Sequence, residues 1–274
     1  MEKIDSINAP DTNKIATGIP IKNVPFPGIT IILFRDYQSV MCGRFSIAVR
    51  ISYLAERFGL SEPSGVSLPR FNIAPGEEVP VITGTGSAQV TMMYWGLIPS
   101  WTKGEKPAMA PINARAEGIA DKNMFQTLLS HGRCIVPATG FYEWKKSGTH
   151  RLPYYIRMKH QEIFGMAGLC DSWMAPDGRI VRSFTVITTS PNSMVLPLHN
   201  RMPAILKRED EKRWLDPGYG ICKGLKTMLN PYPSEEMELY RVTKMVNNPS
   251  FKSETAVQEE LPGTNNELSM WDSR

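Results

Sequence analysis

The sequence predicts an α+β fold, in which a mostly antiparallel, curved sheet closes as a pseudo-barrel and a few helices flank it in a single domain. Strand-like runs rich in β-branched and aromatic residues outnumber helix-like runs, and they do not alternate regularly with helices as in a parallel βαβ array. The chain has 274 residues, of which 42% are hydrophobic and 21% are charged, so it can bury a substantial core.

The first elements are expected shortly after residue 50. Apolar residues at helical spacing indicate a short helix over residues 52–60. Two strand-like runs, 79–83 and 89–94, flank a glycine-containing turn signal at 84–87. Alternating runs joined by such a turn predict a β-hairpin.

A second helix is expected to be capped by Asp121, to run to Ser130 and to be followed by Gly132. Its buried stripe would consist of Met124, Phe125, Leu128 and Leu129. Five strand candidates follow, separated by Pro, Gly and Asn turns: 133–136, 141–144, 154–158, 163–169 and 183–188. Residues 209–215 are expected to form a surface helix.

Residues 41–249 are expected to form the domain, between an N-terminal extension of residues 1–40 and a polar C-terminal tail of residues 250–274. The extension contains four prolines and no sustained periodicity. It is interpreted as a poorly ordered extension, a removable leader or translation from an upstream start codon. Met41 directly before Cys42 favours the last interpretation.

Composition indicates a reduced, intracellular protein. The net charge of +4 permits a polyanionic partner without requiring one. The four cysteines are scattered without a Cys-x-x-Cys pair, which argues against a disulfide framework. The first residues lack the basic region, apolar run and small-residue cleavage site typical of a secretory signal, and no apolar run is long enough to span a bilayer, so a cytoplasmic location without membrane contact is expected. It also lacks glycine-rich nucleotide-binding loops and zinc-ligand spacing.

The block Met41-Cys42-Gly43-Arg44-Phe45 carries the first candidate catalytic residue. If everything before Cys42 is removed, its α-amine and its thiol share one carbon frame. The amine, with a pKa of about 8, can condense with an aldehyde, and the thiol can then close a five-membered thiazolidine ring. An internal Cys42 cannot do this, because an amide nitrogen is not nucleophilic. A buried structural cysteine is the alternative interpretation.

Aromatic and proline residues in loop-like sequence form a second group of candidates. They occur in the blocks 71–76 and 94–101, which contain Asn72, Pro75, Trp95 and Trp101. Flat, rigid side chains of this kind can stack on unpaired bases, with about 1–3 kcal/mol per base. Packing in the core is the alternative for each tryptophan.

Three further blocks supply polar candidates. Asn113, Arg115 and Glu117 would share one face of an extended run, where Asn113 could orient a reacting group and Arg115 could hold a phosphate. Glu143 lies among aromatic neighbours, which favour a raised pKa suited to a general acid or base. His199 is the strongest histidine candidate for proton transfer. A solvated strand face and a structural histidine are the alternatives.

Together these blocks resemble the SRAP family (SOS response-associated peptidases), whose members are also described as abasic-site processing proteins. The resemblance covers residues 41–248, with the blocks in family order and Val246-Asn247-Asn248 at the end. The 40-residue extension departs from the family pattern, because family members usually present the cysteine directly after the initiator methionine.

The resemblance implies that Cys42 crosslinks through a thiazolidine to the ring-opened aldehyde of an abasic site in single-stranded DNA. Glu143 would assist proton transfer, His199 would act as acid or base and support reversal, and Asn113 would position the amine. The implied DNA-binding residues are Arg44, Asn72, Pro75, Trp95, Trp101, Arg115, Thr188 (or Thr189 in its place) and Arg201. The resemblance further implies self-processing peptidase activity, a lyase-type activity, no metal or organic cofactor, a monomer, and association with the nucleoid when DNA is bound.

Two other functions fit the same residues. The first is a thiol peptidase that acts in trans, with Cys42 as nucleophile and His199 as base. The second is a non-catalytic module that binds single-stranded DNA through tryptophans and arginines, reversibly and with strong salt dependence.

Overall fold

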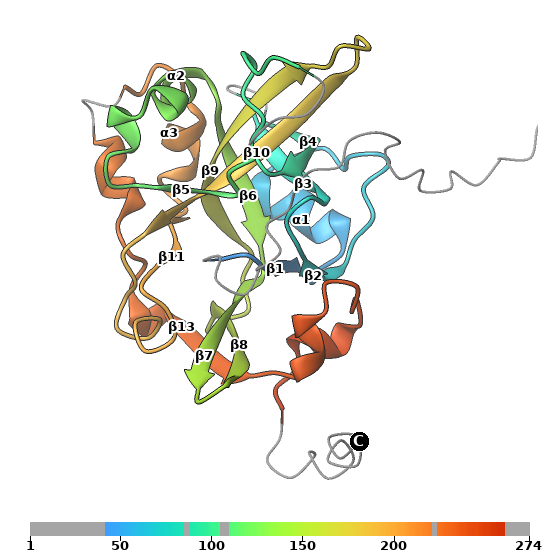
Figure 1. The fold of residues 1–274 in the computed structure, drawn as a ribbon, viewed down its shortest axis with the longest axis vertical. Helices are drawn as coiled ribbons and strands as arrows, with labels where there is room; N and C mark the ends of the chain where they lie inside the picture. Colours follow the sequence, from blue (N-terminus) through green and yellow to red (C-terminus); the bar gives the residue numbers. More distant parts are fainter. Residues whose placement is uncertain (1–41, 85–87, 105–109, 221–223, 261–274) are drawn as a thin grey trace, which may run out of the picture. The chain divides into compact units, whose positions relative to one another are not determined.

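The computed structural model describes residues 42–84, 88–104, 110–220 and 224–260 (Figure 1). The expected N-terminal extension, residues 1–40, and the last part of the expected tail, residues 261–274, lie outside the described residues. In the described part, no helix is long and apolar enough to cross a membrane.

The described strands form two sheets that are mostly antiparallel. The five-stranded sheet has the order β13 (Met237–Arg241), β8 (His150–Met158), β7 (Gly140–Ser147), β1 (Phe45–Ile47) and β2 (Arg70–Ile73). The larger sheet has the order β11 (Met202–Pro203), β10 (Ile180–Thr189), β4 (Gln89–Trp95), β3 (Glu78–Thr83), β6 (Arg133–Ala138), β9 (Phe164–Met174) and β12 (Ile205–Leu206). A short strand, β5 (Asn113–Arg115), pairs with β10 in parallel.

The larger sheet closes on itself, because β10 also pairs with β9. The ring runs β10-β4-β3-β6-β9 and back to β10, and only the β10–β4 pairing within it is parallel. This closed ring confirms the predicted curved, mostly antiparallel pseudo-barrel, and closure leaves no free edge in the ring.

Three α-helices lie among the described residues: α1 (Ile51–Phe58), α2 (Asn123–His131) and α3 (Glu211–Leu215). Gly59 ends α1 in the left-handed region, at φ 63°, and its N–H bonds the carbonyls of Ala55 and Glu56. Short 3₁₀ turns supplement them: η2 (Ile119–Asp121), η4 (Leu225–Leu229), η5 (Ser234–Glu236), η6 (Lys244–Asn247) and η7 (Glu254–Val257).

An aromatic cluster joins the two sheets in the core. The Phe45 ring on β1 meets the Trp95 ring on β4 edge to face, with 5.0 Å between ring centroids. Trp95 in turn stacks on Phe184 of β10 at 6.3 Å. All three side chains are at most 1% exposed. Burying an aromatic side chain of this size contributes about 1.5–3 kcal/mol, so this cluster fixes how β1 sits against the barrel.

Most expected elements occur where the sequence predicts them. The hairpin is β3–β4, whose register pairs Thr83 with Gln89. The five strand candidates correspond to β6, β7, β8, β9 and β10, each longer than expected. In the second helix, Phe125, Leu128 and Leu129 are buried, whereas Met124 is only half-buried.

Two expectations about local structure are wrong. Asp121 does not cap α2, because it closes the preceding 3₁₀ turn and the N-cap position belongs to Lys122. The helix near residue 211 exposes Lys212 and Arg213 as expected of a surface helix, while its inner face carries the fully buried Trp214. The segment after Ser250 is not a tail throughout, because Ala256 is fully buried and the Phe251 carbonyl accepts a hydrogen bond from Asn72.

Candidate active site around Cys42 and Glu143

The site begins where the chain enters β1. β1 pairs with β7 in antiparallel register, with Phe45 opposite Phe141, and the Tyr142 N–H donates to the Arg44 carbonyl. This pairing places Cys42, just before β1, beside Glu143 on β7. The Cys42 backbone N–H donates to Glu143 Oε1 at 2.9 Å, and the Cys42 thiol donates to the same oxygen at 3.2 Å.

The backbone of Cys42 has φ 44°, in the left-handed region that residues with a side chain seldom adopt. Such a conformation costs about 1–3 kcal/mol and persists only where the surroundings enforce it. Here it accompanies the approach of both the nitrogen and the sulfur of one residue to a single carboxylate oxygen. Both residues are nearly enclosed, with Cys42 5% and Glu143 3% exposed.

Burial sets the protonation of this pair. Desolvation raises the pKa of Glu143 to about 7, against the lowering effect of hydrogen bonds from Cys42 and Trp144. The pKa of the Cys42 thiol is raised well above its usual value by burial and then by the adjacent Glu143 charge, whereas the Arg201 charge lowers it. Near neutral pH the Glu143 carboxyl therefore exists in both forms and can accept or donate a proton.

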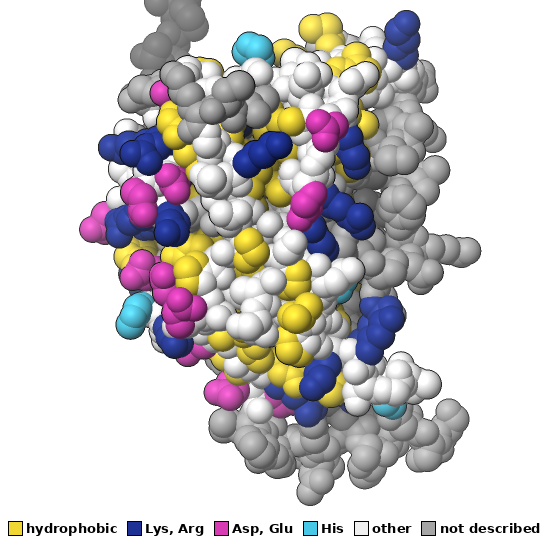
Figure 2. Space-filling view, turned by 90° about the vertical axis from the view of Figure 1, so that its left-hand side faces the viewer, with side chains coloured by type: hydrophobic (Ala, Val, Ile, Leu, Met, Phe, Trp, Pro, Cys, Tyr) yellow, Lys and Arg dark blue, Asp and Glu magenta, His cyan; other side chains and the backbone are white. Residues whose placement is uncertain are grey.

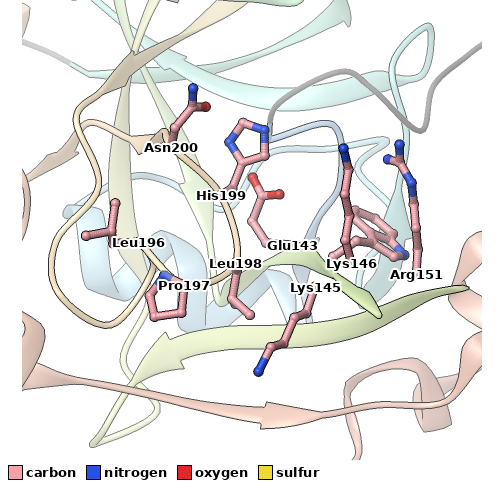
Figure 3. A pocket seen from close by; sticks show the side chains of 10 residues that line it. Glu143, Lys145, Lys146, Arg151, Leu196, Pro197, Leu198, His199 and Asn200 are labelled. Atoms are coloured by element: carbon pink, nitrogen blue, oxygen red, sulfur yellow. The ribbon is translucent and has the colours of Figure 1, made fainter. Parts of the chain in front are cut away.

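A cavity of about 500 Å³ opens beside Glu143 and His199 (Figure 3). Its other lining residues are Trp144, Lys145, Lys146, Arg151, Leu196, Pro197, Leu198 and Asn200. Figure 3 shows the Glu143 side chain directed toward the His199 ring, from the strand β7 on one side and the loop after β10 on the other. The expected pair of Glu143 and His199 therefore shares one solvent-accessible space.

His199 is held in its neutral form by its surroundings. Its Nδ1 accepts a hydrogen bond from the Arg201 backbone N–H at 3.1 Å, so the neutral ring carries its proton on Nε2. Desolvation lowers the pKa of His199, the hydrogen bond with the Arg201 backbone acts against this, and the positive charges of Arg151, Arg201 and Lys146 lower the pKa further. A neutral imidazole at neutral pH can accept a proton from a reacting group.

Arg201 is fixed from two sides and is only 9% exposed. Its guanidinium lies 2.8 Å and 2.7 Å from the two carboxylate oxygens of Glu117, and it also donates to the Thr188 carbonyl. The hydrogen bond from Arg201 is the main cause that lowers the pKa of Glu117 to about 2. Of the two candidate threonines, Thr188 is the one in contact with Arg201.

The strand β5 carries two of the expected residues to the same side of β10. Asn113 lies opposite Val186, and Arg115 lies opposite Thr188. Asn113 is half-buried and Arg115 is exposed. The expected shared face of residues 113, 115 and 117 is wrong for Glu117, because the strand ends at Arg115 and Glu117 turns to pair with Arg201.

Six of the residues expected to bind DNA are buried: Arg44, Asn72, Pro75, Trp95, Thr188 and Arg201. The Arg44 guanidinium donates to Asn72 Oδ1 at 2.9 Å and to the Val246 carbonyl at 2.7 Å. The Asn72 amide donates to the carbonyls of Asn248 and Phe251, so this pair holds the C-terminal segment. Trp95 is a core residue whose Nε1 donates to the Ile112 carbonyl, and Pro75 is buried.

Of the residues expected to bind DNA, Trp101 and Arg115 are exposed. The Trp101 side chain is 52% exposed, which makes it the large aromatic candidate for contact with a base. The face turned to the viewer in Figure 2, which carries α2 and α3 in Figure 1, has basic and acidic side chains interspersed. That face offers no single-sign surface that would attract a polyanion.

Sequence reasoning missed Lys146 and Arg151, which line the cavity. A possible signal was the Lys145-Lys146 pair directly after Glu143-Trp144, but only the strand pairing brings Arg151 next to it. Within the ranges that the structure describes, no three His, Cys, Asp or Glu side chains converge as metal ligands.

Comparison with known proteins identifies the fold and the family. The family model "SOS response associated peptidase (SRAP)" matches residues 41–249. A Bacteroides thetaiotaomicron protein of solved structure is 32% identical, with a TM-score of 0.72 over 80% of this chain and 100% of its own.

Two similar relatives come from Bacillus subtilis and Escherichia coli. Abasic site processing protein YoqW of B. subtilis is 38% identical over 222 residues, which cover 80% of this chain and 99% of the relative. Abasic site processing protein YedK of E. coli is 34% identical over 184 residues, which cover 64% of this chain and 79% of the relative. The fold, the family match and these identities together show that the chain belongs to the SRAP family.

Proposed function

We propose that this chain processes abasic sites in single-stranded DNA by forming a covalent thiazolidine between the lesion and Cys42, once Cys42 is the N-terminal residue. The observation that carries the proposal is the contact of one Glu143 oxygen with both the nitrogen and the sulfur of Cys42, at 2.9 Å and 3.2 Å. The names of the relatives, which are abasic site processing proteins, supply the substrate.

The reaction joins the DNA to both reactive atoms of Cys42. The ring-opened abasic sugar presents an aldehyde, which the α-amine attacks to give a carbinolamine and then, with loss of one water, an imine. The thiol adds to the imine carbon, the C–S bond forms, and the thiol proton passes to the nitrogen. The product is a thiazolidine, and the mass of the adduct equals the sum of the reactants minus one water.

Glu143 is the proton carrier for these steps. Its carboxylate accepts a proton from the attacking amine or thiol, and its acid form donates a proton to the departing hydroxyl of the carbinolamine. A pKa of about 7 suits both tasks near neutral pH. Because the thiol and the amine are bound to adjacent carbons, ring closure is intramolecular and has a large effective concentration.

His199 and Asn113 support the same reaction. The neutral His199 ring, across the cavity from Glu143, takes and returns protons as the sugar ring opens, and it assists reversal of the link. Asn113 orients the amine. Elimination of the 3′ phosphate from the imine, before the ring closes, would give the lyase-type activity.

Residues before Cys42 must be removed for this chemistry. Hydrolysis of the bond between residues 41 and 42 consumes one water and produces the free α-amine of Cys42. The chain performs this step on itself, with Glu143 close to the nitrogen that leaves. When translation starts at Met41, the same bond is the only one to be cut.

The DNA partner is single-stranded, and the chain acts as a monomer in the cytoplasm, bound to the nucleoid when DNA is engaged. An unpaired strand can present its sugar to the enclosed Glu143 and its bases to the exposed Trp101. Arg115 and Arg201 contribute positive charge on the β10 side, where Glu117 already occupies part of the Arg201 guanidinium. No metal or organic cofactor takes part in the steps proposed.

The test compares forms that begin at Met1 and at Met41. The intact mass of each establishes its N-terminus, and each is then incubated with a single strand that contains one abasic site. We expect an adduct, stable to denaturing electrophoresis and one water lighter than the sum, only from protein whose mass shows a free Cys42. Cys42→Ala is the control and should give no adduct.

Other outcomes decide between this proposal and its two alternatives. Turnover of unrelated peptides without DNA would favour a thiol peptidase acting in trans. Salt-sensitive, reversible binding that survives Cys42→Ala, with no adduct from a free Cys42, would leave a non-catalytic DNA-binding module.

A further inference from the structure

Three basic side chains line the cavity beside Glu143 and His199, and two of them, Lys146 and Arg151, face each other across two strands. Lys146 on β7 lies directly opposite Arg151 on β8 in antiparallel register. The neighbouring pairs in the same register are Lys145 with Leu152 and Ser147 with His150, so no carboxylate flanks the two cations on these strands. Within the described ranges, neither cation forms an ion pair.

This arrangement is unfavourable for a protein without a ligand. Side chains directly opposite on antiparallel strands have Cβ atoms about 4.5–5.5 Å apart, and like charges there destabilise the sheet. An anion between the two cations would offset their repulsion. Lysine supplies a compact positive charge, and arginine can hold two oxygens of one phosphate at once.

The position of the pair ties it to the reacting atoms. In Figure 3, Lys146 and Arg151 point to the side of the ribbon where His199 lies, and Lys145 points away from it. The charges of Lys146 and Arg151 are both close enough to His199 to lower its pKa. Arg44, by contrast, is only 5% exposed and bonds protein carbonyls.

We propose that Lys146 and Arg151 form a binding site for a backbone phosphate of the single strand whose abasic sugar reaches Cys42. This inference rests on the proposed function, since it names how the same cavity holds its substrate. The phosphate sits between the two cations at the rim, and the sugar next to it extends inward to Glu143 and Cys42. The pair thereby sets the position of the strand and takes no part in proton transfer.

The experiment measures binding of an intact single strand by protein with a free Cys42, at several chloride concentrations. Lys146→Ala/Arg151→Ala is compared with Lys159→Ala/Lys207→Ala, which removes two exposed positive charges away from the cavity lining. The logarithm of affinity falls with the logarithm of salt concentration, and each cation lost from the strand contact should make this fall less steep by about 0.7. We therefore expect the steepness to decrease by about 1.4 in the first variant and by less in the control. The Lys146→Gln/Arg151→Gln variant, which keeps most of each side chain, repeats the measurement if the alanine variant does not fold.

Two further arms identify the source of the phosphate and separate this inference from the proposed function. Adduct formation with propionaldehyde, which has no phosphate, should be unchanged in the cavity variant, whereas its rate with the abasic strand should fall severalfold. Equal slopes and equal adduct rates in both variants would overturn the inference and leave the proposed function intact. A second result would also overturn the inference. In it, inorganic phosphate at matched ionic strength competes with the strand in the parent protein only, yet the Lys146→Ala/Arg151→Ala variant binds the strand as tightly as the parent. A lower slope with no adduct from any form would support the site and reject the crosslinking function.

Discussion

Glu143 Oε1 lies 2.9 Å from the nitrogen and 3.2 Å from the sulfur of Cys42, so one buried carboxyl contacts both atoms that the proposed chemistry uses. The contact depends on the pairing of β1 with β7, which brings residues 101 positions apart in sequence together. An N-terminal cysteine alone would react with aldehydes in solution. The fold adds the contact of Cys42 with Glu143, a carboxyl group whose pKa of about 7 lets it accept and donate protons.

Replacing Glu143 by glutamine should slow crosslinking by about 10²–10⁴-fold, the usual contribution of a general acid or base. Glutamine keeps an oxygen acceptor at the same place but cannot titrate. In the parent protein the rate should rise with pH through about 7, because the carboxylate form takes the thiol proton. Single-turnover rates measured between pH 5 and 9 test this. In Glu143→Gln the rise near pH 7 should be lost, and only the rise near the pKa of the Cys42 amine should remain. An unchanged profile in the variant would exclude Glu143 as the proton carrier.

The same substitution should change the pH dependence of stability. Glu143 has its folded pKa raised from 4.5 to about 7, so the folded state holds a proton that the unfolded state has already lost. The free energy of unfolding should therefore fall as pH rises from about 4.5 to 7, by about 3 kcal/mol in total. Urea unfolding of Glu143→Gln should lack this decline, which would make the variant more stable than the parent at pH 7.5. A parallel decline in both proteins would contradict the raised pKa.

The two tryptophans expected to stack on DNA should behave differently. Trp95→Ala removes a side chain that is 1% exposed and should lower the free energy of unfolding by about 3–5 kcal/mol. Trp101→Ala removes a side chain that is 52% exposed, and it should leave stability almost unchanged. If Trp101 stacks on a base, its removal should weaken binding of single-stranded DNA by about 1–3 kcal/mol. Thermal unfolding and fluorescence titration measure the two effects, and equal DNA affinity for Trp101→Ala would remove it from the interface.

A buried ion pair links α1 to α3 and should be important for stability. Arg57 donates to both oxygens of Glu211 at 3.0 Å and 2.8 Å, and burial raises the pKa of Glu211. Removing either partner leaves a buried charge, so Arg57→Ala should cost about 3–5 kcal/mol of unfolding free energy. Arg213→Ala, whose side chain is 58% exposed in its pair with Asp210, serves as control and should cost less than about 1 kcal/mol. Similar destabilisation of the two variants would mean that the Arg57 pair is effectively solvated.

Local sequence patterns predicted the elements better than their partners. The hairpin, the strands after residue 132 and the buried face of α2 follow from periodicity and turn residues. Closure of the barrel depends on β10, which pairs with β9 and β4 on its two sides, and no local pattern reveals such long-range pairing. The charged residues of Glu211–Leu215 indicated a surface helix, but they did not reveal that Trp214 on its inner face is fully buried.

The site could be predicted only in part for the same reason. Cys42, Glu143 and His199 carry chemistry that is visible in their types and neighbours, and the structure brings Cys42 and Glu143 into contact and Glu143 and His199 to one cavity. Burial of Arg44 and Trp95 was not visible, because an arginine or a tryptophan in a loop-like block suits a core and an interface equally well. Lys146 and Arg151 face each other because of the register in which β7 pairs with β8, and the sequence alone does not show that register.

The most direct test of the central claim maps the crosslink within the protein. The adduct is treated with iodoacetamide, digested, and its peptides are weighed before and after borohydride reduction. A thiazolidine predicts that the DNA remnant is on the peptide that begins with Cys42, that this thiol is not alkylated, and that borohydride adds no hydrogen. A remnant on any other residue, or a Cys42 thiol that is still alkylated in the adduct, would contradict the account.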